Sequence, residues 1–306
     1  MRAYLKNILS AALLAVFSSM TFAADDGPRM YWNGPVGLNI LQTYAWTAKS
    51  NSISESGAVI DPEIDADMDL LMLGYNRVFD VAGHASIFTA MLTAGSLSAE
   101  AFDRDLRSTR GLGDLYLQGT FNLIGAPALS AKEFADYKQE TLLSLLLGVS
   151  APTGEYDADQ LLNLGTNRWA FRIAMPFVQS FGAWIPGEIT TLELLPSAWF
   201  YGANDDFLGN IELEQDPIYT LEAHLTRDLN TRFYVSLDYF LQSGGETAID
   251  GVDQNDAQNS SFLGGTLGYQ INEQFQFLLR YSSSLSPDPG KDLDIDLWQF
   301  NLNYMW

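Results

Sequence analysis

The chain ends in DLWQFNLNYMW (Asp296–Trp306), and this stretch decides how the rest of the sequence is interpreted. Every second residue from Trp298 to Trp306 is aromatic or leucine, and most residues between them are polar. Because successive side chains of a β-strand point to opposite faces, such a strand has one strongly apolar face and one polar face. Chain ends are usually polar and frayed, so this apolar face needs a partner, either a protein core or lipid.

The same alternation recurs along the chain, most clearly in GLGDLYLQGTFNL (Gly111–Leu123). Most of these segments are longer than the strands of about 5 or 6 residues usual in soluble proteins. They approach the about 9 to 11 residues that cross a bilayer at a tilt. We count twelve of them, at approximately residues 36–46, 68–77, 84–94, 112–123, 141–150, 168–181, 189–201, 217–227, 231–242, 261–271, 275–285 and 294–306.

Long polar connections alternate with short turns between these segments, with one long exception at Ile124–Glu140. An even strand number with long loops on one side is the pattern of outer-membrane barrels. In a soluble barrel or sandwich the outward face would carry Lys and Glu, but here the charged residues lie opposite the aromatic ones. The sequence therefore predicts an all-β fold, a transmembrane antiparallel up-and-down β-barrel of about twelve strands in the bacterial outer membrane, with both termini periplasmic.

The first residues are typical of a secretory leader. Arg2 and Lys6 precede an apolar run at 8–17, and small residues follow up to Ala23. The run is too short for a retained membrane anchor, which needs about 20 apolar residues. We expect a signal peptide at 1–23 and the barrel at 24–306. Residues 24–35 then form an N-terminal segment that lies either in the lumen or in the periplasm.

Composition excludes several classes of function. The chain has no cysteine, which rules out disulfides and thiolate sites. A formal charge of -22 makes it a poor partner for nucleic acid. The acidic run DPEIDADMD (Asp61–Asp69) lacks the central glycine and terminal glutamate of a calcium-binding loop, so we expect a solvated acidic loop there. We expect no metal site and no cofactor.

Charged residues on the polar face of the strands are the candidate lumen residues. They would form either an ion-pair network or a selectivity zone. If the luminal arginines are paired with luminal carboxylates, the lumen is nearly neutral, and the acidic loops then give the channel a weak preference for cations. Tyr31 and Trp32 are candidates for a plug. Tyr304 and Trp306 are candidates for the membrane interface and for recognition by the outer-membrane assembly machinery. The lumen candidates are Arg168, Arg172, Glu193, Glu222, His224, Asp238, Arg280, Tyr116 and Gln118.

Four short motifs resemble a known family of outer-membrane barrels, the MetA-pathway phenol-degradation transporters. They are GLGDLYLQG (Gly111–Gly119), GVSAPTGEY (Gly148–Tyr156), LGTNRW (Leu164–Trp169) and GGETAIDG (Gly244–Gly251). The resemblance extends from about the second strand to the end of the chain. It implies an outer-membrane channel for small hydrophobic or aromatic compounds.

We therefore expect a monomeric channel for passive uptake of such solutes, in contact with outer-membrane lipid and lipopolysaccharide. The alternative is a structural or adhesive barrel without transport. A lipase-type barrel enzyme is a weaker alternative, because His84 and Ser86 share a strand face, as do His224 and Thr226, but neither pair is followed by the Asn-Gly of the barrel phospholipases. We expect no enzymatic activity.

Overall fold

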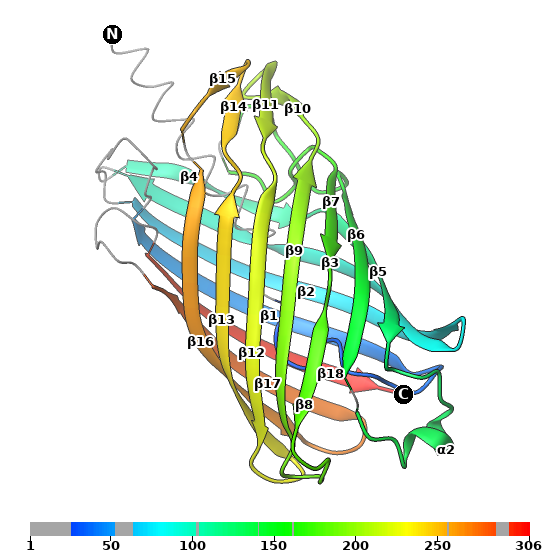
Figure 1. Ribbon diagram of the computed structural model, residues 1–306. Coiled ribbons are helices and arrows are strands. Elements are labelled where there is room, and N and C mark those ends of the chain that lie inside the picture. The colour runs from blue at the N-terminus through cyan, green and yellow to red at the C-terminus, as the bar shows by residue number, and fades with distance from the viewer. Residues whose placement is uncertain are drawn as a thin grey trace.

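The computed structural model forms a closed antiparallel β-barrel (Figure 1). It describes residues 26–52, 64–101, 104–139, 141–160, 162–255, 257–285 and 294–306. The expected signal peptide at 1–23 lies outside these residues, as do residues 61–63, the start of the acidic run.

Twelve strand positions make up the barrel wall, and two of them are occupied by a pair of shorter strands. Consecutive positions pair antiparallel around the barrel, and β18 pairs with β1, with Tyr304 opposite Leu41, to close it. The predicted fold class and strand order are thus confirmed. The wall strands are β1 (Asn39–Ser52), β2 (Ile64–Val81), β3 (His84–Ala101), β4 (Arg104–Leu112), β5 (Leu115–Ile124), β6 (Leu142–Ala151), β7 (Ala170–Ala174), β8 (Phe177–Phe181), β9 (Thr190–Tyr201), β12 (Ile218–Asp228), β13 (Phe233–Gly244), β16 (Gln258–Gln270), β17 (Phe275–Ser284) and β18 (Asp294–Met305).

Two predicted strands are interrupted. The segment expected at 168–181 breaks at Met175–Pro176 into β7 and β8, because proline has no backbone N–H for the ladder. The segment expected at 112–123 is interrupted at Gly113–Asp114, so that β5 forms most of it, while β4 lies almost wholly in residues that we expected to be loop; both β4 and β5 pair with β3. The strands β1 to β3 also extend beyond their predicted ends, into residues that we expected to be loop.

Three long connections contain structure that the sequence did not predict. The strands β10 (Asn204–Phe207), β11 (Ile211–Gln215), β14 (Thr247–Ile249) and β15 (Val252–Asp253) form a small separate sheet beyond the wall (Figure 1). The connection after β5 contains one helical turn, α2 (Ala131–Phe134), which is capped by Ser130 and Glu133. In the described part of the chain, no helix is long and apolar enough to cross a membrane.

The apolar side of the alternation faces outward. On β18, Trp298 and Phe300 are 44% and 43% exposed, whereas Gln299 and Asn301 are 3% and 4% exposed. Polar side chains are therefore inside and apolar ones outside, the inverse of a soluble protein and the arrangement that lipid requires. The outward apolar surface also includes Leu71, Leu73, Leu92, Leu147, Phe171, Ile173, Leu225, Leu237 and Leu302.

The two ends of the barrel differ. Short connections, α2 and the C-terminus lie at one end, which we call the short-turn end, and the small sheet lies at the opposite, long-loop end (Figure 1). The tight turn between β2 and β3 has positive φ at Ala82 (54°) and Gly83 (87°), as a two-residue hairpin requires. Trp306 exchanges two backbone hydrogen bonds of 3.0 Å with Asn39 and stacks on Tyr304 at the short-turn end. The proposed role of Tyr304 and Trp306 in assembly stays a prediction.

Candidate functional site

The N-terminal segment (Asp26–Pro35) lies inside the barrel, bound to side chains that point inward from the wall. The backbone N–H of Asp26 donates to Glu222 (2.8 Å), and that of Arg29 donates to Glu193 (2.8 Å). The Arg29 guanidinium forms an ion pair with Asp228 at 2.6 Å. Because Asp228 ends β12 at the short-turn end, the segment occupies that half of the lumen.

Tyr31 and Trp32, the plug candidates, both face the barrel interior. The Tyr31 hydroxyl donates to Asp26 (2.5 Å), and the ring packs on Leu146, Ala174 and Leu195. Burial, together with the neighbouring Asp26 carboxylate, raises the pKa of Tyr31 well above its ordinary value, so it stays a neutral donor. The Trp32 indole donates to Glu193 (3.0 Å). Their position fits a plug, while any effect on conductance stays a prediction.

Five of the predicted lumen residues belong to one buried cluster. Arg172 on β7 contacts Glu222 on β12 at 3.3 Å. His224 lies between two carboxylates, with Nδ1 2.8 Å from Asp238 and Nε2 3.5 Å from Glu222. Glu193 faces His224 across the β9–β12 pair. The strand register brings these residues together, because β9, β12 and β13 are consecutive and the charged positions lie on the inner face of each.

An ion-pair network of the lumen candidates would pair Arg168, Arg172 and Arg280 with Glu193, Glu222 and Asp238. Arg172 does contact Glu222, but Arg168 does not follow this scheme. Arg168 instead donates to Gln215 (2.5 Å) and lies over the Tyr201 ring (4.7 Å). Burial lowers the pKa of Arg168 to about 10, so it stays cationic at neutral pH. Arg280 lies against Gly27, where an added Cβ would be only 2.7 Å from Nη1.

The N-terminal segment adds charged partners to the buried cluster. Asp26 and Arg29, which we did not place in the lumen, bring their own charges to the cluster and take up Arg172 and Asp228. Their closeness in sequence to Tyr31 and Trp32, the plug candidates, in DDGPRMYW (Asp25–Trp32) is the signal that could have identified them.

A second segment enters the lumen from the long-loop end. The connection between β6 and β7 carries Leu162 and Leu164, each 2% exposed, which pack against Met68, Leu70 and Leu97 on the inner wall. Asp114, at the break between β4 and β5, accepts hydrogen bonds from Gly154 N–H (2.8 Å) and from both the N–H and the hydroxyl of Thr166. We call this connection (152–169) the inner loop.

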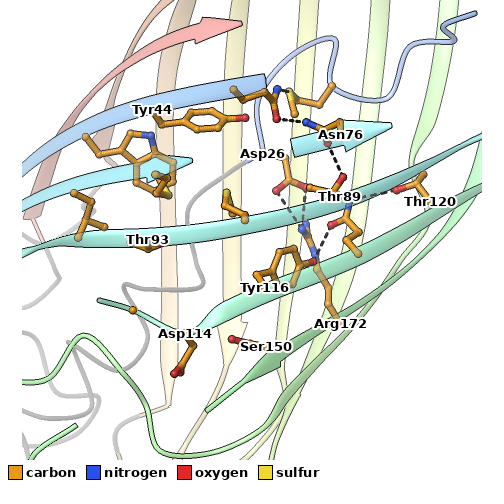
Figure 2. A pocket seen from close by; sticks show the side chains of 18 of the residues that line it. Asp26, Tyr44, Asn76, Thr89, Thr93, Asp114, Tyr116, Thr120, Ser150 and Arg172 are labelled. Atoms are coloured by element: carbon orange, nitrogen blue, oxygen red, sulfur yellow. Dashed lines mark hydrogen bonds and ion pairs between the residues drawn. The ribbon is translucent and has the colours of Figure 1, made fainter. Parts of the chain in front are cut away.

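A cavity of about 130 Å³ lies between the N-terminal segment and the inner loop (Figure 2). Asp26, Met30 and Tyr31 line it on one side, and Leu164 and Asp114 on the other. Its apolar wall comes from strands β1 to β3 and β9, through residues that we did not single out: Tyr44, Trp46, Leu70, Met72, Ile87, Met91 and Trp199.

Polar side chains form the rest of the cavity wall. Tyr116 and Gln118, both predicted, line it and share a hydrogen bond of 2.8 Å. On the opposite strands Asn76 donates to Gln42 (2.6 Å) and accepts from Thr89 (2.6 Å). Arg172 reaches the cavity next to Asp26 (Figure 2). The cavity thus offers aromatic and aliphatic surface with a few hydrogen-bonding groups.

The pairs considered for a lipase do not form a catalytic arrangement. The Nδ1 atom of His84 lies 3.0 Å from the carbonyl of Gly125 at the short-turn end. His224 contacts carboxylates, while the Thr226 hydroxyl lies 2.7 Å from that of Thr191. In the described residues no group of three or more His, Asp and Glu side chains is arranged to hold a metal ion. Of the acidic run, the first members, Asp61 and Glu63, lie outside those residues.

Comparison with known proteins places this geometry in context. The model of the family described as "Putative MetA-pathway of phenol degradation" matches residues 48–289. An outer membrane channel from Pseudomonas putida F1 is similar in structure, with a TM-score of 0.78 and 22% identity over 92% of this chain and 99% of that one. The transport unit of the autotransporter AIDA-I from Escherichia coli has a TM-score of 0.52 and 7% identity, over 96% and 97% of the two chains. These likenesses concern the fold. No curated protein sequence matches the chain.

Proposed function

Since the chain belongs to the MetA-pathway phenol-degradation family and is an outer-membrane β-barrel, we propose that it is a channel for passive uptake of small hydrophobic or aromatic solutes. The observation that carries this proposal is the cavity in the middle of the lumen. Its wall combines aromatic, methionine and leucine side chains with hydrogen-bonding groups, the usual composition of a small-molecule site.

The volume of the cavity fits a single ring. An engineered protein cavity of about 150 Å³ binds benzene, and the volume here is about 130 Å³. Sugars and peptides are larger and need more hydrogen bonds than this wall offers. A neutral aromatic solute also avoids the cost of moving a charge from water into a narrow pore.

The route runs from the long-loop end, past the inner loop, to the cavity and then past the N-terminal segment. The inner loop and the N-terminal segment both line the cavity, through Leu164 and Tyr31 respectively. Transport through such a barrel runs down the concentration gradient. In this proposal the chain works as a monomer and catalyses no reaction.

The test is solute flux into liposomes that contain the purified protein, with benzyl alcohol and glucose as solutes. Met91→Trp fills the cavity and is expected to lower the benzyl alcohol rate at least fivefold. Leu92→Trp is the matched control, because the adjacent Leu92 is 51% exposed on the outer face. A rate that is equal in the two variants would overturn the proposal. No flux of any solute would favour the structural or adhesive alternative.

A further inference from the structure

Asp26 of the N-terminal segment and Arg172 of the barrel wall form an ion pair, and both residues line the cavity. Both carboxylate oxygens of Asp26 lie within hydrogen-bond distance of Arg172 Nη1, at 3.1 and 2.9 Å. The Arg172 side chain is 4% exposed, and that of Asp26 is 24% exposed. Asp26 is therefore the more accessible partner, and Figure 2 shows the pair beside the cavity.

The remaining nitrogen atoms of Arg172 are held by the barrel wall. Nε and Nη2 donate to the Ser197 hydroxyl at 3.3 and 3.1 Å, and Nη2 also donates to Glu222 at 3.3 Å. Arg172 also lies over the Trp199 ring, 5.1 Å from its centre. The guanidinium is thus fixed by strands β9 and β12. Among its described hydrogen-bond partners, Asp26 is the one that does not belong to a wall strand.

We propose that Arg172 is a binding site for the carboxylate of an aromatic acid, and that Asp26 occupies this site as an internal competitor. The inference rests on the proposed function, because the ring of the acid would lie in the cavity next to Tyr116 and Trp199. The carboxylate of the acid would take the place of the Asp26 carboxylate on Nη1. A charged pair of this kind is stronger than a neutral hydrogen bond, so it can select for an acid.

Exchange of one carboxylate for another keeps the buried guanidinium paired. Arg172 keeps Glu222 and gains the ligand as it loses Asp26, so the guanidinium is not left without a partner, which would be costly. The displaced carboxylate is that of Asp26, the more exposed member of the pair. The exchange also loosens the start of the N-terminal segment, since the Asp26 side chain then keeps the hydroxyl contact with Tyr31 and loses the one with Arg172, while the Asp26 backbone N–H still donates to Glu222. The ion pair between Arg29 and Asp228 would still hold the rest of the segment.

A neutral aromatic solute has no such effect. It can fill the cavity, but it has no group that would displace Asp26 from the guanidinium. An aromatic acid would therefore be both a ligand and the signal that loosens the segment.

The experiment compares benzoate with benzyl alcohol, its neutral counterpart, by titration calorimetry on the folded, detergent-solubilised barrel. Asp26→Asn removes the competing charge, and we expect benzoate to bind at least tenfold more tightly than in the unaltered chain. Benzyl alcohol should bind within twofold in both. Asp228→Asn is the matched control, because it breaks the other ion pair of the same segment and leaves Asp26 on Arg172; we expect benzoate affinity within twofold of the unaltered chain.

Two results would overturn the inference. One is equal benzoate affinity in Asp26→Asn and the unaltered chain. The other is an increase in benzoate affinity in Asp228→Asn as large as that in Asp26→Asn, which would indicate that any loosening of the N-terminal segment favours binding. Tyr31→Phe offers a second variant if Asp26→Asn does not fold, and it should tighten benzoate binding about threefold. If benzyl alcohol binds and the affinity for benzoate is not higher in Asp26→Asn than in the unaltered chain, this inference alone fails. If neither probe binds any variant, the proposed function fails with it.

Discussion

Asp114 holds Thr166 through two hydrogen bonds to one carboxylate oxygen, from the backbone N–H at 3.0 Å and from the hydroxyl at 2.7 Å. Asp114 belongs to the wall and Thr166 to the inner loop. The pair therefore fixes Leu164, two residues away from Thr166, at the cavity.

Replacing Asp114 by Ala should release the inner loop. Three donors lose a charged acceptor, and the net contribution of such hydrogen bonds, after exchange with water, is on the order of 1.5 to 3 kcal/mol each. We expect a larger single-channel conductance and a lower thermal unfolding midpoint. Asp157→Asn is the control, because Asp157 bonds within the loop itself, to the N–H of Asp159 and the side chain of Gln160. Equal conductance in the two variants would show that the loop does not restrict the lumen.

Deleting residues 24–34 should open the short-turn half of the lumen. The segment fills space between β7, β9 and β12, and water can solvate the carboxylates that it leaves behind. We expect single-channel conductance in a planar bilayer to rise severalfold. Unchanged conductance would remove the plug hypothesis for Tyr31 and Trp32.

The unaltered channel should prefer cations weakly. Arg172 is compensated by Asp26 and Glu222, while Asp205, Asp206, Glu212 and Glu214 are exposed at the long-loop end. Their potential extends over about a Debye length, ~8 Å at physiological salt. Reversal potentials in a KCl gradient measure this preference. Clear anion selectivity would mean that the arginines control the lumen instead.

A charge on the outer face should be costly in proportion to its depth. Leu237 lies in the middle of β13 and is 55% exposed, whereas Leu229 follows β12 at the short-turn end and is 59% exposed. Leu237→Arg should lower the free energy of unfolding in lipid by about 2 to 4 kcal/mol, and Leu229→Arg by about 0 to 1 kcal/mol. Denaturant titration in vesicles gives both values. Equal losses would argue against lipid at the middle of the barrel.

Removing the Trp306 side chain should impair assembly more than stability. Its backbone pairs with Asn39, and its ring is 52% exposed. In Trp306→Ala the hydrogen bonds remain, so the barrel should refold in detergent as the unaltered chain does. Yield in the outer membrane should fall at least threefold if the ring is part of the assembly signal. A normal yield would leave Trp306 with an interfacial role only.

The alternation of the strands made the barrel predictable, because lipid imposes the same inside-outside rule on every residue from Trp298 to Asn301. It also placed Arg172, Glu222, His224 and Asp238 on the inner face. Their partners were harder to predict, since the pairing depends on the path of a segment without periodicity, from Asp26 to Pro35. Pro176 lies at the break between β7 and β8, which the alternation of the segment did not predict.

The cavity could not be derived from strand periodicity alone. Leu164 reaches it through the inner loop, whose position depends on the three hydrogen bonds to Asp114. Tyr44 and Met72 are inward-facing apolar residues on strands whose inner face was expected to be polar. Both exceptions to the alternation line the cavity, so they mark the apolar part of its wall.

The path of the N-terminal segment also constrains the order in which the molecule folds. Asp26 and Arg29 are separated by 146 to 199 residues from Arg172, Glu222, Thr226 and Asp228, to which they bind. Such distant contacts form slowly, since a long loop must close before they contribute. The first residues of the described chain can therefore reach their final position only after the strands through β12 have been joined, so that an early part of the sequence becomes one of the last parts to settle.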